Sequence, residues 1–148
     1  MKIILSAITL IFYLSSNGQS NNYSKFVNYR LINKKQTVKT DGDEKDITYL
    51  GKIQNKNGKT IFYVLTVFEK VQAAIVIHGH SNIIYLDNNK DFKRQFELGA
   101  PNDLPFKLKH NNLYYRYINP KTDKREVYVN YVGNQIPKVM CVAPNDCY

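Results

Sequence analysis

The segment His78-Gly79-His80 brings two side chains that can ligate a metal close together. In an extended strand, residues i and i+2 point to the same side, so both imidazoles could bind one metal ion, with His110 or Asp87 as a third ligand. If residues 78–81 instead formed a turn between two strands, both rings would lie at an exposed tip without a preorganised third ligand. The sequence favours ordinary surface histidines and keeps a metal site as the alternative.

Other catalytic patterns are weaker. Ser81 follows His80, but the segment lacks the closing glycine of a nucleophile elbow, and adjacent residues of a strand point to opposite faces. Glycoside hydrolysis would need two carboxylates in one cleft, and no pattern marks two of Glu69, Glu97 and Glu126 as partners. A glycine-rich phosphate loop is absent from the sequence. We therefore expect a protein without an enzymatic activity and without a cofactor.

Cys141 and Cys147 are the two cysteines of the chain and lie within its last eight residues. In an exported protein, an even pair of cysteines is expected to form a disulfide. The intervening Pro144-Asn145 favours a turn that brings the two sulfurs together. Closing so short a loop contributes about 2 kcal/mol in the chain-entropy model. We expect a disulfide that fixes the C-terminus, with free thiols or an intermolecular link as the alternatives.

The N-terminus has the pattern of a secretory signal peptide. Lys2 precedes the apolar run Ile3–Leu14, and a small polar stretch follows, which ends at Gly18. The apolar run is too short to span a bilayer, which takes about 20 residues. We expect residues 1–18 to be a cleaved signal peptide and residues 19–148 to be a single exported domain, periplasmic or secreted. An uncleaved signal anchor is the alternative.

The composition favours a β-rich fold. In residues 19–148, Tyr, Phe, Ile and Val far outnumber Ala, Leu and Met, and side chains of the first group favour strands. Short apolar runs alternate with Asn- and Gly-containing turn sequences at hairpin spacing. We predict an all-β or β-rich α+β fold, an antiparallel meander that forms a small sandwich or a partly open barrel. The expected strands are Thr48–Gln54, Thr60–Lys70, Ala73–His78, Asn82–Asp87, Phe106–His110, Leu113–Asn119, Arg125–Val132 and Lys138–Val142.

The run Thr60–Lys70 is predicted to be a central strand. Both of its alternating sets are apolar, as at the neighbours Val64 and Leu65, so both faces must be covered. A second layer is therefore required, either another sheet or a helix. Tyr23–Asn33 and Asp91–Leu98 each fit a short helix or a strand, and the sequence leaves both assignments open.

Two polar segments are predicted to connect or flank these strands. The Asn-Gly pair at 57–58 is the strongest hairpin signal of the chain. Residues 34–46 are rich in charges of both signs and are predicted to form a surface loop. That loop does not match a calcium-binding loop that starts at Asp41, because Asp46 stands in place of the required glycine and Lys52 in place of the last carboxylate.

A basic face is predicted on the hairpin around Asn111-Asn112. If these two residues form the turn, Lys109 pairs with Tyr114 and Lys107 with Arg116. Strand alternation then directs five side chains toward the core, namely Phe106, Leu108, Leu113, Tyr115 and Tyr117. The next hairpin can add Tyr128 to the opposite, solvent-facing side. The predicted partner-binding residues are therefore Lys107, Lys109, Tyr114, Arg116 and Tyr128.

The net charge of +9 and the predicted basic face favour an anionic partner, such as an acidic protein, a phosphate-bearing polymer or an acidic glycan. The same side chains also fit the ordinary solvated face of a sheet. We predict an exported, non-catalytic β-domain that binds a protein or an anionic polymer, as an immunity or inhibitor protein or an envelope adaptor does. Sequence-specific nucleic-acid binding is not expected. The alternative is a small metal-dependent hydrolase that uses His78 and His80.

Overall fold

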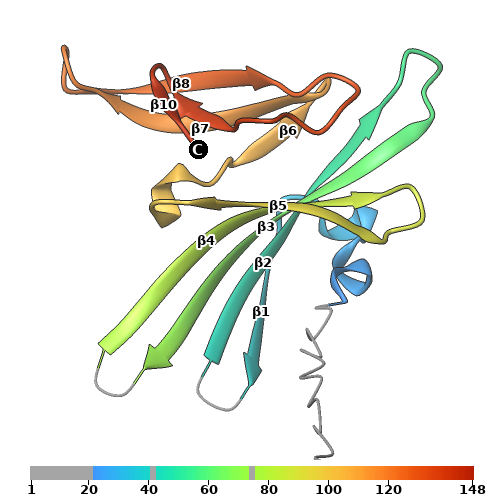
Figure 1. The fold of residues 1–148 in the computed structure, drawn as a ribbon, viewed down its shortest axis with the longest axis horizontal. Coiled ribbons are helices and arrows are strands. Elements are labelled where there is room, and N and C mark those ends of the chain that lie inside the picture. Colours follow the sequence, from blue (N-terminus) through green and yellow to red (C-terminus); the bar gives the residue numbers. More distant parts are fainter. Residues whose placement is uncertain (1–21, 41–42, 74–75) are drawn as a thin grey trace, which may run out of the picture.

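The computed structural model describes residues 22–40, 43–73 and 76–148. These residues form antiparallel β-sheets joined by turns, with short 3₁₀ turns as their only helical elements (Figure 1). The predicted antiparallel all-β fold is confirmed. The predicted signal peptide, residues 1–18, lies outside the described residues. Among the helical turns that are described, none has the length and apolar character needed to cross a bilayer.

The larger sheet is an antiparallel meander. Its strands are neighbours in sequence order across the described part of the chain, and they close no barrel. The predicted Asn-Gly hairpin lies between the second and third strands, where Gly58 adopts a positive φ of 75° and its N–H donates to the Asn55 carbonyl. The strands are β1 (Lys35–Thr40), β2 (Asp43–Gln54), β3 (Thr60–Ala73), β4 (Val76–Asp87) and β5 (Phe92–Leu98).

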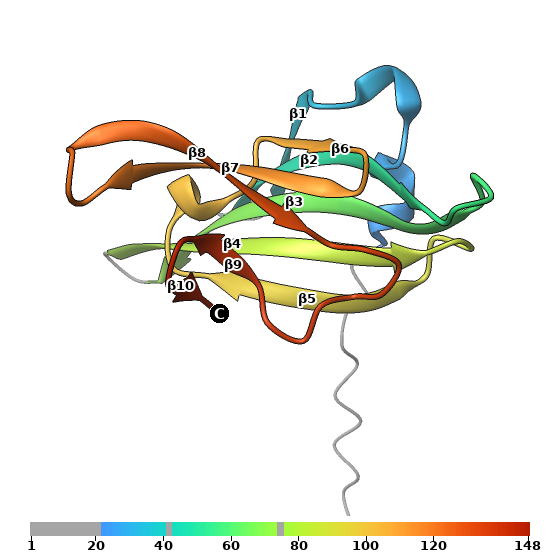
Figure 2. The same ribbon diagram turned by 90° about the horizontal axis from the view of Figure 1, so that it is seen from above.

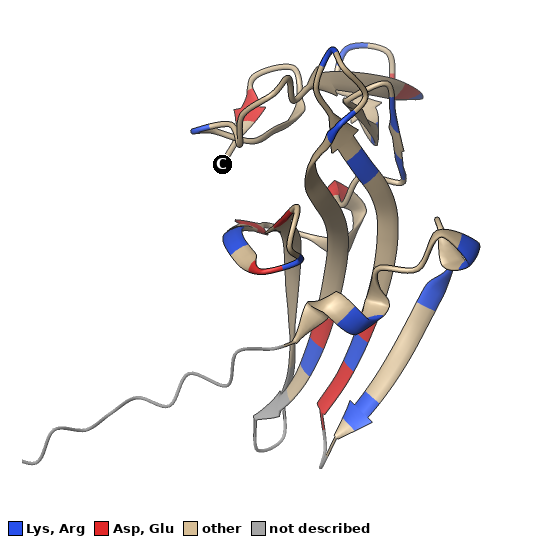
Figure 3. Cartoon of the chain, turned by 90° about the vertical axis from the view of Figure 1, so that its right-hand side faces the viewer, with Lys and Arg blue, Asp and Glu red and all other residues tan. Residues whose placement is uncertain are grey.

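The expected charged loop at residues 34–46 is wrong, because most of it forms β1 and the beginning of β2. Opposite charges face each other across these strands, since Lys35 Nζ lies 3.0 Å from Asp46 and Lys39 Nζ lies 3.4 Å from Glu44. Figure 3 shows the basic and acidic residues interleaved along these strands. Cross-strand pairing therefore turns a segment that looks like a solvated loop into a strand.

The predicted turn at residues 78–81 is also wrong, because β4 runs through it. Ala73–His78 and Asn82–Asp87 are not separate strands around a turn, because Val76–Asp87 is one continuous strand that pairs with β3 along its whole length. Gly79 supports this close pairing, since a Cβ atom there would lie 2.9 Å from the ring of Phe68. Gly79 therefore lies within the strand, where its lack of a side chain leaves room for the Phe68 ring, and not in a turn.

The two segments that the sequence left open are now assigned. Asp91–Leu98 contributes the edge strand β5. Tyr23–Asn33 contains two 3₁₀ turns, η1 (Tyr23–Phe26) and η2 (Tyr29–Leu31). The Asn22 and Asn28 side chains cap these turns by accepting backbone N–H groups two residues later. Neither segment forms an α-helix.

The smaller sheet consists of β6 (Lys107–Lys109), β7 (Asn112–Asn119) and β8 (Lys124–Tyr131), and the turn η3 (Pro101–Asp103) precedes it. The short strands β9 (Cys141–Ala143) and β10 (Asp146–Cys147) follow. The predicted disulfide joins Cys141 to Cys147 and confirms that the C-terminus is fixed to the preceding strand. The predicted strand Lys138–Val142 is thereby replaced by the hairpin β9–β10.

Both faces of the central strand β3 are covered, as predicted. Val64 contributes to a core between the two sheets, which also contains Leu113, Tyr115 and Met140. Its neighbour Leu65 contributes to a second core on the opposite face, against η1. Figures 1 and 2 show the smaller sheet over one end of the larger sheet, with the strands of the two sheets inclined to one another. The fold is therefore a two-layer sandwich whose larger sheet extends beyond the smaller one.

Asn111 fixes one side of the smaller sheet to the larger one. Its side-chain oxygen accepts the N–H of Gln54 at 3.1 Å, and its side-chain nitrogen donates to the carbonyl of Gln54 at 2.7 Å. Asn111 lies in the β6–β7 turn with a positive φ of 58°, a conformation that asparagine tolerates better than most residues. This double hydrogen bond holds the β6 end of the smaller sheet against β2 and leaves β8 on the opposite side.

Candidate binding face

The face of the smaller sheet that points away from the larger sheet is called the outer face here. The β6–β7 and β7–β8 registers define it, because directly opposite residues of antiparallel strands share a face. The residues on it are Lys107, Lys109, Asn112, Tyr114, Arg116, Ile118, Arg125, Val127, Val129 and Tyr131. Four of the five residues predicted to bind a partner are therefore on one face, namely Lys107, Lys109, Tyr114 and Arg116.

Tyr128 is not on this face. It lies opposite Tyr115, which is fully buried between the two sheets, and its ring centroid is 6.3 Å from that of Tyr115. Tyr128 accordingly packs against the core and is partly buried. The expectation that it joins the basic side chains is wrong, because the β7–β8 register places it on the inner side.

The predicted hairpin register is also shifted. Lys107 lies opposite Tyr114 and Lys109 opposite Asn112, so the turn is His110-Asn111 and not Asn111-Asn112. The shift moves each partner by two positions, and a movement of two residues along a strand returns to the same face. The assignment of side chains to the two faces therefore survives an incorrect register.

Phe106 is an exception to that assignment. It precedes the first residue of β6, and its N–H donates to the carbonyl of Tyr114. Its ring lies 6.5 Å from the Tyr114 ring, and the Arg116 guanidinium lies 4.1 Å above its centroid. Phe106 was expected to point into the core, but it contacts two residues of the outer face, because strand alternation does not extend beyond the end of the strand.

The outer face carries an apolar strip that the sequence analysis missed. Tyr131 is 70% exposed, Ile118 60%, Val127 56% and Val129 45%. Three of these side chains alternate along β8, and the register places Ile118 beside them on β7. The signal was present in the alternation of residues 125–131. It did not show which face is exposed, because alternation alone would assign an apolar set such as Val127 and Val129 to the core.

The basic residues of the outer face differ from those of the larger sheet in their partners. Lys45 pairs with Glu69 at 2.7 Å, and Lys70 pairs with Glu44 at 2.8 Å, both on the larger sheet. By contrast, within the part of the chain that the structure describes, the cations of the outer face form no ion pair or side-chain hydrogen bond. These unpaired cations are Lys107, Lys109, Arg116 and Arg125.

No acidic side chain occupies any described position of the outer face. Lys107 Nζ instead lies 6.0 Å from the centroid of the Tyr114 ring, and Arg116 lies over Phe106. Such cation–π contacts orient the charged groups without neutralising them. The face therefore presents a net positive potential to a partner.

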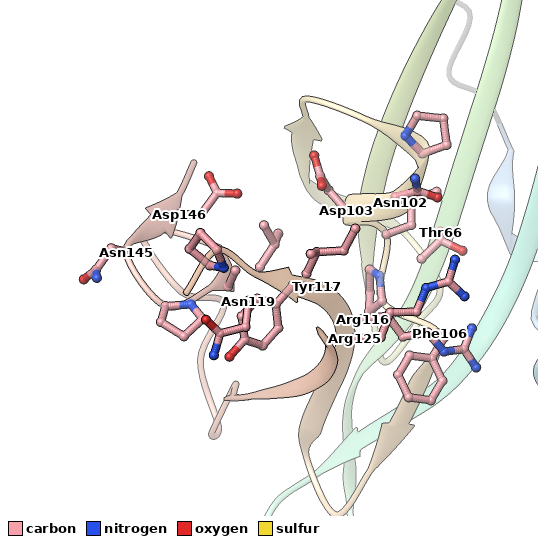
Figure 4. A pocket seen from close by; sticks show the side chains of 18 of the residues that line it. Thr66, Asn102, Asp103, Phe106, Arg116, Tyr117, Asn119, Arg125, Asn145 and Asp146 are labelled. Atoms are coloured by element: carbon pink, nitrogen blue, oxygen red, sulfur yellow. The ribbon is translucent and has the colours of Figure 1, made fainter. Parts of the chain in front are cut away.

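A pocket of about 1040 Å³ adjoins the outer face. Arg116 and Arg125 line it and also belong to the outer face. Figure 4 shows both arginines beside Phe106, with Asp103 on another side of the pocket. The Asp103 carboxylate is engaged, since it accepts the Tyr148 hydroxyl at 3.0 Å. The outer face thus continues into a concave region that carries two guanidinium groups.

The histidines do not assemble the metal site that the alternative required. His78 and His80 lie on β4, as the i and i+2 argument needs, and His80 Nδ1 lies 2.9 Å from a Glu97 oxygen. Of the two expected third ligands, His110 is in the β6–β7 turn, and Asp87 is at the far end of β4, where it pairs with Lys93. In the described ranges, no three His, Cys, Asp or Glu side chains are grouped so that they could hold a metal ion.

The carboxylates considered for acid–base chemistry are also separated. Glu69 pairs with Lys45, Glu97 with His80, and Glu126 accepts the Tyr117 hydroxyl at 2.7 Å. That last hydrogen bond lowers the pKa of Glu126, and the amide of Asn119 adds to the effect. Each carboxylate thus has its own partner in a different part of the fold, and the structure brings no two of the three together.

The fold and this face define a class: a two-layer antiparallel β-sandwich domain with a basic and apolar outer surface. No protein-family model, curated protein or solved structure matches the chain.

Proposed function

We propose that this protein is a non-catalytic binding module that binds an acidic protein through the outer face of its smaller sheet. The observation that carries the proposal is the combination of four exposed apolar side chains with four unpaired cations on a face without a described carboxylate. Five lysines of the larger sheet pair with acidic residues of the same chain, whereas these four cations form no such pair in the described structure.

The apolar strip favours a protein over a simple anionic polymer. Protein interfaces combine an apolar centre with a polar rim, and aromatic residues and arginine are enriched in them. Val127, Val129 and Tyr131 supply an apolar centre, and Arg116 and Arg125 flank it. A polyanion would use the positive charges and leave the valines exposed to water. Contiguous exposed apolar surface on a soluble domain is itself typical of an interaction site.

The predicted export of the domain narrows the kind of partner. An exported binder without catalytic machinery fits an immunity or inhibitor protein that neutralises an acidic toxin or enzyme, or an adaptor in the cell envelope. Both roles require tight association with a folded or extended acidic surface, and neither requires a reaction. The proposed activity is therefore protein binding, and the identity of the bound protein would decide between these two cellular roles.

A charge-reversal experiment tests the proposal. The double variant K107E/R116E reverses two cations of the outer face, and K56E/K59E makes the same change in charge on the β2–β3 turn. Both variants and the wild type are immobilised and exposed to the exported protein fraction of the source cells. A captured protein is then purified, and its dissociation constant is measured for all three baits.

We expect K107E/R116E to weaken binding about tenfold, because each reversed rim charge changes the binding free energy by roughly 0.5–1 kcal/mol. The control K56E/K59E should bind within twofold of the wild type. Increasing salt should weaken wild-type binding more than that of K107E/R116E. Equal effects of the two double variants, or undiminished binding by K107E/R116E, would show that the outer face is not the binding surface.

A further inference from the structure

The open side of β8 is a structural feature that the charge of the outer face does not explain. In the smaller sheet the order of strands is β6-β7-β8, so β8 pairs with β7 on one side only. The opposite end of the sheet lies near β2, where Asn111 joins Gln54. Within the described chain, no strand pairs with the outer side of β8. This edge is the natural place for a further strand.

The direction of the backbone groups of β8 follows from one hydrogen bond. The N–H of Val132 donates to the carbonyl of Asn111 at 3.0 Å, and this pair continues the β7–β8 register by one residue. In an antiparallel ladder, hydrogen-bonded and non-hydrogen-bonded pairs alternate. The even-numbered residues of β8 therefore bond to β7, and the odd-numbered ones direct their N–H and C=O groups to the open side. These are Arg125, Val127, Val129 and Tyr131.

The same four residues carry their side chains on the outer face. Their backbone groups and their exposed side chains are thus both accessible along one strand. The strand runs for eight residues, or about 26 Å at about 3.3 Å per residue, and its pairing with β7 shows no register shift. It contains neither proline nor glycine. An edge of this kind lacks the bulges and prolines that usually prevent strand addition.

We propose that β8 accepts an extended segment of the acidic partner as a fourth strand of the smaller sheet. This inference rests on the proposed function and adds the mode of binding and the chemistry of the partner. The segment alternates apolar and acidic side chains on the side that joins the outer face, so that apolar groups lie beside Val127 and Val129 and a carboxylate reaches Arg125. Arg116, on the neighbouring strand β7 and diagonal to Arg125, adds positive charge to the same face.

Two other occupants fit this edge less well. A second copy of the chain would bring two sets of unpaired cations together, in a protein whose net charge is already +9. A nucleic acid or a glycan has no alternating N–H and C=O groups to match those of β8. Addition of a peptide strand uses the backbone groups for affinity and alternate side chains for specificity, which is what this strand offers.

The test uses a random twelve-residue peptide library displayed on phage, selected against the purified full chain. The diagnostic variant is V129P, and its matched control is V129T. The proline removes the N–H that Val129 directs to the open side, and this N–H takes no part in the pairing with β7. Threonine has a similar shape and keeps the N–H. Near-ultraviolet circular dichroism checks that both variants retain the fold.

We expect the selected peptides to alternate apolar and acidic residues, and one of them is then synthesised for affinity measurements. It should bind V129P at least tenfold more weakly than the wild type, and V129T within threefold. A second arm leaves the protein unchanged and methylates every second backbone nitrogen of the peptide. The peptide has two alternating sets of backbone N–H groups, and only one set faces β8. Methylation of that set should abolish binding, and methylation of the other set should have little effect.

Each alternative outcome has a distinct meaning. Equal binding to wild type, V129P and V129T overturns strand addition and leaves the proposed function intact if R116E still weakens binding. Selection of peptides without alternation, or of none, also overturns strand addition. If V129P binds like the wild type and R116E also leaves binding unchanged, the proposed function is overturned as well. A dimer that forms at physiological ionic strength in size-exclusion chromatography, and that V129P dissociates, would make a second copy the occupant and overturn the assignment to a partner protein.

Discussion

The substitution L113A, compared with I118A on the same strand, tests which face of β7 is buried. Leu113 is fully buried between the two sheets, and Ile118 is 60% exposed on the outer face. Leucine-to-alanine replacement in a core removes about 2–3 kcal/mol of transfer free energy, and the cavity left behind adds to this loss. We expect L113A to lower the free energy of unfolding by about 3–4 kcal/mol. The cost of I118A should stay below about 1 kcal/mol, because most of its side chain is already in water.

Urea unfolding followed by far-ultraviolet circular dichroism measures both variants. With an m-value of about 2 kcal/mol per molar urea, L113A should lower the midpoint by about 1.5–2 M, and I118A by less than about 0.5 M. A similar midpoint for the two variants, or a greater loss for I118A, would mean that the smaller sheet presents the opposite face to solvent. The outer face would then not exist as described, and neither binding proposal could stand.

Three further outcomes follow from other parts of the fold. Replacement of both cysteines, in C141S/C147S, should lower the free energy of unfolding by about 2 kcal/mol in thermal or urea unfolding, and an unchanged stability would show that the disulfide contributes nothing to it. Burial raises the pKa of Tyr49 to about 12, so stability should fall as the pH rises from about 10 toward 12, and Y49F should reduce this loss in alkaline unfolding curves. The hydrogen bond from Tyr117 lowers the pKa of Glu126, so this carboxylate stabilises the fold above its unfolded value of 4.5 and loses that effect as the pH falls below it. E126Q should therefore speed amide exchange in the β7–β8 hairpin at pH 7 and have a smaller effect at pH 3, and equal effects at both would refute the assignment.

The strands of the core were predictable because their side chains follow simple periodic patterns. Val64 and Leu65 are adjacent apolar residues of β3, and their fully buried positions on opposite faces follow from alternation and the need for two cores. The placement of Lys107 and Arg116 was likewise predictable, although the register was not. The prediction survived because an even shift along a strand preserves the face.

Other features depend on partners that are distant in sequence. Lys35 looks like a loop residue until Asp46 is placed diagonally across from it, and only the pairing of β1 with β2 does so. The inward position of Tyr128 depends on its register with Tyr115, which the turn sequence between β7 and β8 does not specify. The exposure of Val127 could not be predicted either, because Val127 and Val129 belong to the apolar set of β8, which alternation alone assigns to the core. Sequence periodicity therefore predicts which residues share a face but not always which face is inside.

The unpaired edge of β8 has a consequence for handling the protein in concentrated solution. At physiological ionic strength, electrostatic repulsion acts over about 8 Å, farther than the roughly 4.8 Å between neighbouring strands, so the arginines and lysines keep two such edges from docking. In about 1 M salt the repulsion decays within about 3 Å, and the valine-rich edges of separate molecules can approach to bonding distance. We expect dilute buffer to keep the protein monodisperse and molar salt to favour pairs of molecules joined edge to edge, because each molecule offers one β8 edge.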